Sequence, residues 1–177
     1  PLADMLGMQR IKAELEDRSL YYLDPIGYAE IEQKISQVRD RGEQVLASIK
    51  EKLAMRLDEE HYHYTIDSRI KQIYSIYNKM YGQNKTFEEI YDLFAVRIIV
   101  DEVSDCYNVL GIIHDMFKPI PGRFKDYIST PKPNLYRSLH TTVIGREGIP
   151  FEVQIRTWDM HQTAEYGVAA HWKYKQG

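Results

Sequence analysis

The sequence is poor in cysteine, in tryptophan and in long apolar runs, and each shortage excludes a class of protein. Its single cysteine, Cys106, cannot form an internal disulfide, which is typical of a reducing compartment such as the cytoplasm. No apolar stretch approaches the roughly 18 residues that a membrane span needs, so we expect no membrane partner. The chain begins Pro-Leu-Ala-Asp, without a methionine or a charged-then-apolar leader, which we interpret as a fragment of a longer cytoplasmic protein.

Glycine-rich phosphate motifs are also absent. Neither Gly-x-x-x-x-Gly-Lys-[Ser/Thr] nor Gly-x-Gly-x-x-Gly occurs, which excludes a P-loop or a kinase-type phosphate cradle as far as motifs can. The formal charge of −3, from 23 Lys and Arg against 26 Asp and Glu, argues against binding to duplex nucleic acid. Tyrosine is in excess, with 14 residues against 5 Phe and 2 Trp. Because tyrosine both packs and stacks on bases, it suits a core with polar edges or a nucleotide site.

Two long helical patterns occupy the first third of the chain. Leucine and isoleucine recur at helical spacing over residues 2–23, and the pattern breaks at Asp24 and Pro25. Asp24 is a suitable N-cap, and Pro25 a suitable first residue, for a second helix. The apolar stripe of that helix continues to about residue 57, with Gly42 as a weak point. Its charged outer side is typical of a solvated surface.

After residue 57 the pattern changes to short alternating segments. Strands and helices are intermixed, which predicts an α+β fold. We expect residues 1–57 to form a helical extension and residues 58–177 to form the domain proper. The expected elements are a strand at 61–66, a helix at 69–81 capped by Asp67 or Ser68, a short helix at 87–91, a strand at 93–100, a helix at 104–117, a loop at 118–137, a hairpin of 139–145 with 151–157, and a helix at 158–172.

The helix expected at 69–81 has a basic side that suits a polyphosphate. Cations and a hydroxyl beside the free amides of a helix start can neutralise and orient phosphate groups. A plain amphipathic helix with a solvated basic side gives the same pattern, so both interpretations stay open at this point. The residues concerned are Arg69, Lys71, Ser75 and Lys79.

The loop at 118–137 is strongly basic in a chain that is acidic overall. Its five cations against Asp126 leave a local charge of +4, which favours an anionic partner. Tyr127 and Tyr136 interleave with these cations, a combination that suits base stacking with phosphate neutralisation. A solvated surface loop is the alternative. The cations are Lys118, Arg123, Lys125, Lys132 and Arg137.

Two carboxylates could face the same cleft. Glu152 lies with Gln154 and Arg156 on the polar side of an alternating strand, which is either solvent-exposed or lines a cleft. Asp92 stands before an apolar strand that only Arg97 interrupts, and it either pairs with Arg97 or joins Glu152. Two carboxylates near bound phosphates are the minimum for holding Mg²⁺. Strict alternation sends Asp92 and Arg97 to opposite faces, so Asp92 must precede the strand or a bulge must intervene.

Other histidine pairs and the cysteine are expected to be structural. His114 and Asp115 form an isolated dipeptide on an expected helix, and His161 with Glu165 lacks a third metal ligand. Cys106 has no activating neighbour and should be packed.

Six motifs follow one another along residues 61–177. They are Arg69-Ile-Lys-x-x-x-Ser75-Ile-x-x-Lys79-Met80, Asp92-Leu-Phe-Ala-Val-Arg97-Ile, Pro119-Ile-Pro-Gly-Arg-Phe-Lys-Asp-Tyr-Ile128, Pro131-Lys-Pro-Asn-x-Tyr136-x-Ser-Leu-His140-Thr-Thr, Phe151-Glu-Val-Gln-Ile-Arg-Thr157 and Ala164-Glu-Tyr-Gly-Val-Ala-Ala-His171-Trp172-Lys173-Tyr174. Together they resemble the RelA/SpoT family, and residues 1–57 resemble the helical segment that precedes this domain in its long members. The motif Arg-Phe-Lys-Asp at 123–126 resembles the basic version of a loop found in bifunctional synthetase–hydrolases.

The resemblance implies a (p)ppGpp synthetase domain with a mixed β-sheet flanked by helices, similar to nucleotidyltransferases. Such enzymes transfer the β,γ-pyrophosphate of ATP to the ribose 3′-hydroxyl of GDP or GTP and release AMP. This transfer needs charge neutralisation and in-line placement, and no protein nucleophile.

The resemblance also implies residue roles by motif. Asp92 and Glu152 would be catalytic and bind Mg²⁺, with Glu152 taking the 3′-hydroxyl proton. For ATP, Arg69 and Arg97 would sandwich adenine, and Lys71, Ser75 and Lys79 would hold the phosphates. For GDP or GTP, Tyr136 would stack on guanine near Asn134, His140 and Gln154, and Lys125 and Lys132 would hold the phosphates.

The wider context is implied by the same resemblance. The activity would serve the bacterial stringent response, and the hydrolase and C-terminal regulatory domains would lie outside this chain, with any ribosome contact made through them. A nucleotide-binding module that is inactive without its neighbouring domains is the alternative function. A single-stranded RNA binder using Tyr127 and Tyr136 is a third, and it predicts a steep salt dependence.

Overall fold

The chain is built on one mixed β-sheet. The computed structural model describes residues 2–165, with side chains from residue 10 onward. The sheet runs in the order β1-β2-β6-β5-β3, with β4 also paired to β5. β2 and β6 are parallel, and the other pairs are antiparallel. The strands are β1 (Tyr64–Ile70), β2 (Phe94–Val100), β3 (Lys118–Pro119), β4 (Lys125–Asp126), β5 (Leu139–Ile144) and β6 (Pro150–Thr157).

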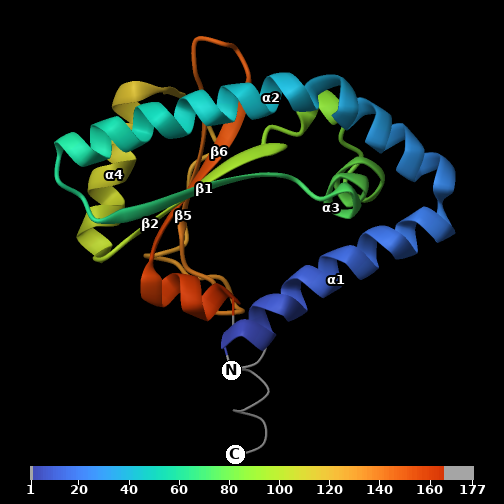
Figure 1. Cartoon of the computed structure of the whole chain (residues 1–177), viewed down its shortest axis with the longest axis horizontal. Coiled ribbons are helices and arrows are strands. Elements are labelled where there is room, and N and C mark those ends of the chain that lie inside the picture. The colour runs from blue at the N-terminus through green and yellow to red at the C-terminus, as the bar shows by residue number, and fades with distance from the viewer. Residues whose placement is uncertain (1, 166–177) are drawn as a thin grey trace, which may run out of the picture.

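Two helices cover one face of this sheet (Figure 1). α2 (Pro25–Glu59) packs on β1 and β2, and α4 (Val103–Met116) packs on β6. The apolar sides of both helices and the inward residues of the strands form a hydrophobic core. Its completely buried members include Leu53, Leu57, Val96, Ile113 and Ile155. The expected α+β fold, with a mixed sheet flanked by helices, is confirmed, and the opposite face of the sheet remains for polar residues.

The helical N-terminal third is bent at Asp24, as predicted. α1 (Leu2–Leu23) ends there, and the Asp24 carboxylate accepts a 2.9 Å hydrogen bond from the Gly27 amide at the start of α2. This cap satisfies an amide that the first helical turn leaves without a partner. The two helices open into a V at this bend, with α3 (Ile73–Tyr77) between them (Figure 1).

α2 belongs to the same core as the sheet. Its buried residues join the cluster formed by the strands and α4, so the boundary expected between residues 57 and 58 does not divide two cores. Gly42, expected to be a weak point, lies where α2 crosses the start of β2. A Cβ at Gly42 would lie 2.1 Å from Cζ of Phe94, so the missing side chain is what lets helix and strand approach.

The strand expected at 61–66 and the helix expected at 69–81 are both misplaced. β1 extends to Ile70, and α3 continues into a π-helical turn, η1 (Asn78–Gly82). β1 pairs with β2 along its whole length, with Asp67 opposite Arg97, so Asp67 and Ser68 are strand residues instead of helix caps. Pairing over this sequence distance outweighs the local capping signal. Arg69, expected at the start of a helix, is therefore a residue of strand β1.

The remaining elements lie close to their expected positions. The short helix at 87–91 is a 3₁₀ turn, η2 (Phe87–Glu89), and the hairpin of β5 and β6 is confirmed. The loop at 118–137 contains the two short strands β3 and β4. Residues 158–165 are helical, and the rest of the helix expected at 158–172 lies outside the described residues. Within the described part, no helix combines the length and apolar character needed to cross a bilayer.

Candidate functional site

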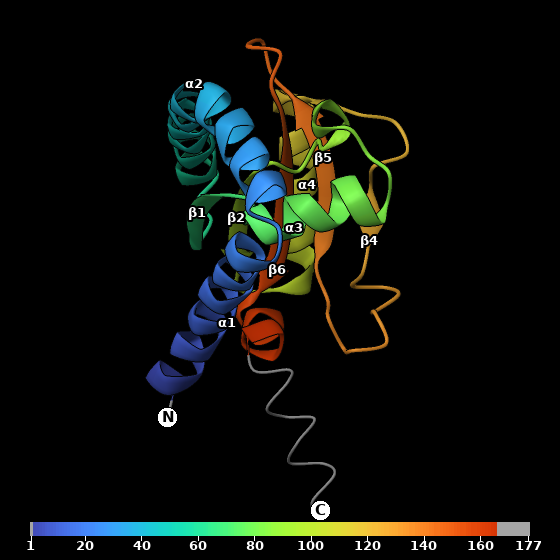
Figure 2. The same ribbon diagram turned by 90° about the vertical axis from the view of Figure 1, so that its right-hand side faces the viewer.

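A cleft of about 450 Å³ opens on the polar face of the sheet. The parallel pairing explains its position, because β2 and β6 begin at the same edge, with Ala95 opposite Glu152. Asp92 precedes β2 and Glu152 stands near the start of β6, so the two carboxylates line the same cleft. The loop at 118–137 and the segment around α3 stand beside the sheet in Figure 2 and supply the rest of the lining.

Asp92 is held by two ammonium groups. Nζ of Lys71 donates to its Oδ2 over 2.8 Å, and Nζ of Lys79 donates to the same oxygen over 2.7 Å. Burial raises the pKa of Asp92, but the two ammoniums outweigh burial and lower this pKa to about 2. Asp92 is therefore a carboxylate at neutral pH. Because β2 begins only at Phe94, Asp92 precedes the pleated strand, which resolves the conflict between its face and that of Arg97.

Glu152 is oriented by its neighbours on the sheet. Its Oε1 accepts a 2.7 Å hydrogen bond from Nε2 of Gln154 and lies 3.6 Å from Nδ1 of His140. Gln154 and Arg156 are buried, so the polar side of β6 is covered and is not the half-solvated surface that the sequence also allowed. Burial and nearby cations, Lys132 foremost, lower the pKa of His140 to about 4, so its imidazole is neutral at pH 7.

An aromatic cluster adjoins these groups. The hydroxyl of Tyr136 lies 2.7 Å from Nε2 of His140, and the Tyr127 ring meets the His140 ring edge to face, with the ring centroids 5.3 Å apart. Nζ of Lys132 lies 4.6 Å from the centroid of the Tyr127 ring and 5.2 Å from that of Tyr136. Flat rings beside a cation can stack on a base and hold its phosphates.

The basic loop is tied to the fold at two points. The Asp126 carboxylate accepts hydrogen bonds from the amides of Ile128 and Ser129 and from the hydroxyl of Tyr107 on α4. These bonds fix the turn after β4. At the other side of the cleft, the guanidinium of Arg123 lies 4.8 Å from the ring centroid of Tyr91, next to Asp92. The loop is therefore anchored, and three of its cations, Arg123, Lys125 and Lys132, line the cleft together with the two carboxylates.

Most of the residues predicted for the site are brought together. Those that line the cleft are Lys71, Lys79, Asp92, Lys125, Lys132, His140, Glu152 and Gln154.

The other predicted residues lie around the cleft and do not line it. Arg97 pairs with Asp67 and, over 3.6 Å, with Glu165. The alternative pairing of Asp92 with Arg97 is therefore wrong. Oδ1 of Asn134 accepts the Tyr136 amide over 3.2 Å, which fixes the turn that carries Tyr136. The predicted residues outside the lining are Arg69, Ser75, Arg97, Asn134 and Tyr136.

Further lining residues were not assigned to the site from sequence. Arg123 and Tyr127 belong to the basic loop, and Thr142 alternates with His140 along a strand. These sequence patterns could have assigned the three residues to the site. Lys85, Glu89 and Tyr91 lie in or next to the short 3₁₀ turn η2, and no functional pattern in the sequence marked them. The Lys85 amide bonds to the Lys79 carbonyl over 3.1 Å, which holds this segment beside η1.

The two carboxylates fit a divalent cation only if other ligands join them. Among residues 10–165, no three His, Cys, Asp or Glu side chains gather as a metal-binding group. Asp92 and Glu152 supply oxygen atoms of the type that Mg²⁺ prefers, and Mg²⁺ bound with substrate phosphates normally takes one or two protein carboxylates. The residues present therefore fit a metal shared with a polyphosphate.

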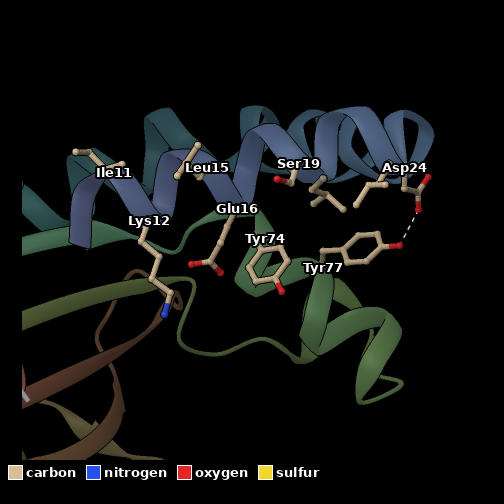
Figure 3. Close-up of a pocket in the computed structure, with 10 residues that line it drawn as sticks. Ile11, Lys12, Leu15, Glu16, Ser19, Asp24, Tyr74 and Tyr77 are labelled. Carbon is tan, nitrogen blue, oxygen red and sulfur yellow. Dashed lines mark hydrogen bonds between the residues drawn. The ribbon is translucent and has the colours of Figure 1, made fainter. Parts of the chain in front are cut away.

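A second, apolar cavity of about 650 Å³ lies between α1 and α3 (Figure 3). Ile11 and Leu15 of α1 face it, and the Tyr77 hydroxyl donates to Asp24 over 2.8 Å at its end. Within residues 10–165, its lining holds the acids Glu16 and Asp24 but Lys12 as the single cation. Among these residues it lacks the clustered cations of the first cleft, which is therefore the candidate active site.

Paired carboxylates at the start of two parallel strands, beside a cleft ringed by cations, define a nucleotidyltransferase-like domain. The family model described as "Region found in RelA / SpoT proteins" matches residues 68–177. The chain belongs to the RelA/SpoT family, as its motifs predicted.

Curated relatives are much longer than this chain. A Synechocystis protein named probable guanosine-3′,5′-bis(diphosphate) 3′-pyrophosphohydrolase is 54% identical over 177 residues, covering 99% of this chain and 23% of that protein. A GTP pyrophosphokinase from Streptomyces coelicolor is 49% identical over 176 residues, covering 99% of this chain and 21% of that protein. The chain thus spans less than a quarter of each of these two relatives.

Solved structures share the fold. Small alarmone synthetase 2 from Bacillus subtilis is 32% identical, with a TM-score of 0.63 and with 77% of this chain and 79% of that chain covered. Small alarmone synthetase 1 from the same organism, solved with its product pppGpp, has a TM-score of 0.63 at 23% identity. The match covers 83% of this chain and 82% of that chain. The second likeness shows the fold alone.

Proposed function

We propose that this domain transfers the β,γ-pyrophosphate of ATP to the ribose 3′-hydroxyl of GDP or GTP, which yields (p)ppGpp and AMP. The observation that carries the proposal is the convergence of two carboxylates and six cations on one cleft beside stacking aromatic rings. The cations are Lys71, Lys79, Lys85, Arg123, Lys125 and Lys132. The GTP pyrophosphokinase named among the relatives and the 32% identical alarmone synthetase structure support this reaction.

The charge of the cleft supports polyphosphate ligands. ATP and GDP together bring roughly seven negative charges at neutral pH, and charge-assisted hydrogen bonds from lysine and arginine are the means by which proteins hold them. The six cations face three lining acids, Glu89, Asp92 and Glu152. A cleft for one uncharged ligand would gain nothing from this concentration of positive charge.

The positions of the side chains suggest a division of labour. Lys71 and Lys79, on the α3 side, would hold the ATP phosphates, and Tyr136 with Lys132 would orient the guanosine nucleotide. Glu152, whose Oε1 is fixed by Gln154, would accept the proton of the 3′-hydroxyl. The 3′ oxygen then bonds to the β-phosphorus of ATP as the bond from that phosphorus to the α–β bridging oxygen breaks, and AMP leaves with the bridging oxygen.

Asp92 and Glu152 would hold Mg²⁺ together with phosphate oxygens. The metal would supply neutralisation of the charge on the transferred group. The residues of the chain would supply the positioning. Their cations place the two substrates in line, which removes most of the entropic barrier of a reaction between two bound anions.

The cellular setting is also a proposal. The relatives named above are bacterial, which supports a role in the stringent response within the bacterial cytoplasm. Since those relatives carry more than three quarters of their length outside the matched region, hydrolase and regulatory domains, with any ribosome contact, belong to sequence beyond this chain.

The decisive experiment is a product assay with radiolabelled ATP. The chain, incubated with γ-labelled ATP, GDP and Mg²⁺, should form labelled ppGpp, and a parallel reaction with α-labelled ATP should form labelled AMP in an equal amount, both separable by thin-layer chromatography. Calorimetric binding of GDP without any product would favour the nucleotide-binding module. Product formation that persists without GDP or GTP would contradict the proposed acceptor.

A further inference from the structure

Arg156 is a buried cation that forms no ion pair with an acid among residues 10–165. The residue is 3% exposed, and its Nε has no hydrogen-bond partner within that part of the chain. On the same face Arg97 pairs with Asp67 and with Glu165, and no ion pair among residues 10–165 involves Arg156. Burial, foremost, and the like charges of Arg97 and Arg69 lower the pKa of Arg156, and the negative charge of Glu165 offsets only part of this effect.

Such a residue costs stability. A buried charge that lacks a partner is among the least favourable groups in a folded protein, and an apolar side chain of the same length is normally better tolerated at such a site. Buried polar atoms without partners are rare enough that each one calls for a reason. The packing of the core supplies none here, because Arg156 lies on the face of β6 opposite to the core residues Val153 and Ile155.

The contact that Arg156 does make is with Tyr136. Its guanidinium carbon lies 5.9 Å from the centroid of the Tyr136 ring, within the range of a cation–π interaction. The same ring is held at its hydroxyl by His140 and approached by Lys132 from the loop. His140 reaches the ring from β5, and Arg156 reaches it from β6, whose backbone is fixed by pairing on both sides.

The arrangement of loop and sheet shows what this contact can do. Tyr136 follows Leu135, whose φ of 68° is unfavourable for a branched apolar side chain, so its turn is not held by local preference alone. A ring that serves as a stacking platform must keep one orientation before the base arrives, because ordering it during binding would cost affinity. A buried guanidinium on a central strand is a rigid support for such a ring.

We propose that Arg156 is a positioning residue that holds the Tyr136 ring in the orientation that stacks on guanine, at the expense of the stability of the fold. The inference rests on the proposed function and deepens it. Arg156 sets the affinity for the guanosine nucleotide without touching it, and its contact with Tyr136 predicts a larger effect on GDP binding than on ATP binding.

The test is Arg156→Met, which keeps the length of the side chain and removes the charge. The dissociation constant for GDP, measured by calorimetry, should rise about tenfold, the size of effect expected for losing a desolvated cation–π contact. The KM for GDP should rise likewise with kcat changed less than the KM, and the KM for ATP should change much less than the KM for GDP. The melting temperature should stay equal or increase, since an unpaired buried charge has been removed.

Two further variants complete the design. Arg156→Lys restores the charge and should recover part of the GDP affinity. Arg146→Met, at an exposed position of the β5–β6 turn, should leave both affinities and the melting temperature unchanged.

Two results overturn the inference. One is unchanged GDP affinity in Arg156→Met; the other is a lowered melting temperature with both KM values raised together, which marks a purely structural residue. A wild-type chain that binds GDP without forming product contradicts the proposed function, whereas the calorimetric and thermal comparison still tests Arg156.

Discussion

Nζ of Lys79 lies 2.7 Å from Oδ2 of Asp92, and Nζ of Lys71 lies 2.8 Å from the same oxygen. The cations expected to hold ATP phosphates are thus neutralised by a carboxylate expected to hold Mg²⁺. While these two pairs persist, the ammoniums weaken the attraction of Asp92 for a metal ion, and Asp92 weakens theirs for phosphate. Phosphate oxygens that draw the lysines away would release Asp92 at the same moment, so binding of the polyphosphate and exposure of the metal ligand are coupled.

This coupling predicts that a divalent ion binds with ATP and not before it. Mn²⁺ added to the chain alone should bind weakly, because two ammoniums compete for Asp92. ATP should strengthen Mn²⁺ binding by at least roughly tenfold, since it removes the competing charges and adds phosphate ligands. The measurement is the free Mn²⁺ signal in electron paramagnetic resonance, with and without ATP.

The double variant Lys71→Met and Lys79→Met separates this account from simple chelation by ATP. It should bind Mn²⁺ better than the wild type when ATP is absent. Equal Mn²⁺ affinity in the two proteins would show that the lysines do not shield Asp92.

Removing either carboxylate should stop the reaction without unfolding the chain. Glu152→Gln removes the proposed base and should lower the rate of product formation by at least about 100-fold. Asp92→Asn should have an effect of similar size, because it removes a charged metal ligand. Circular dichroism checks the fold of each variant. Asp115→Asn, a matched change at an exposed carboxylate on α4, should retain the wild-type rate, and near-normal rates in either site variant would refute the assignment.

Local patterns predicted the elements that depend on neighbouring residues. The cap at Asp24 and the β5–β6 hairpin were confirmed because both are decided within a short stretch of chain. The packed state of Cys106 was also confirmed, and burial raises the pKa of its thiol to about 12.

Long-range pairing decided what the patterns missed. Asp67 and Ser68 have the chemistry of helix caps, yet pairing with a strand some thirty residues away makes them part of β1. The parallel contact of β2 with β6 joins segments even further apart and sets Asp92 beside Glu152. The motifs identified both carboxylates. The hydrogen bonds of Lys71 and Lys79 to Asp92 and the burial of Arg156, however, depend on tertiary structure alone.

His140 should make stability depend on pH. Burial disfavours the charged form of its imidazole. The pKa is lowered further by the positive charges of Lys132, Arg156 and Arg69, and the negative charge of Asp92 raises it in part. Its pKa is lowered from 6.5 in the unfolded chain to about 4 in the fold. Between these values the unfolded state binds more protons, so stability falls as the pH drops from 6.5 towards 4.

The expected loss attributable to His140 is about 2 kcal/mol between pH 7 and pH 5. Urea unfolding at both pH values measures it, and His140→Gln should show a smaller difference between them. His61→Asn is the control, since His61 is exposed and its φ of 60° suits asparagine. An undiminished pH dependence in His140→Gln would assign the effect to other groups.

Gly42 should tolerate no side chain. In Gly42→Ala the new Cβ would lie 2.1 Å from Cζ of Phe94, and Phe94 begins β2 two residues after Asp92. Separating α2 from β2 should cost about 1–3 kcal/mol of unfolding free energy, as overpacking does in other cores. Gly111→Ala in α4, where nothing lies within 4 Å of a new Cβ, should instead stabilise the chain by about 0.5–1 kcal/mol through helix propensity. Shortening the opposing ring in Gly42→Ala with Phe94→Leu should recover part of the loss; if the double variant is no more stable than Gly42→Ala, the contact with Phe94 is not the cause.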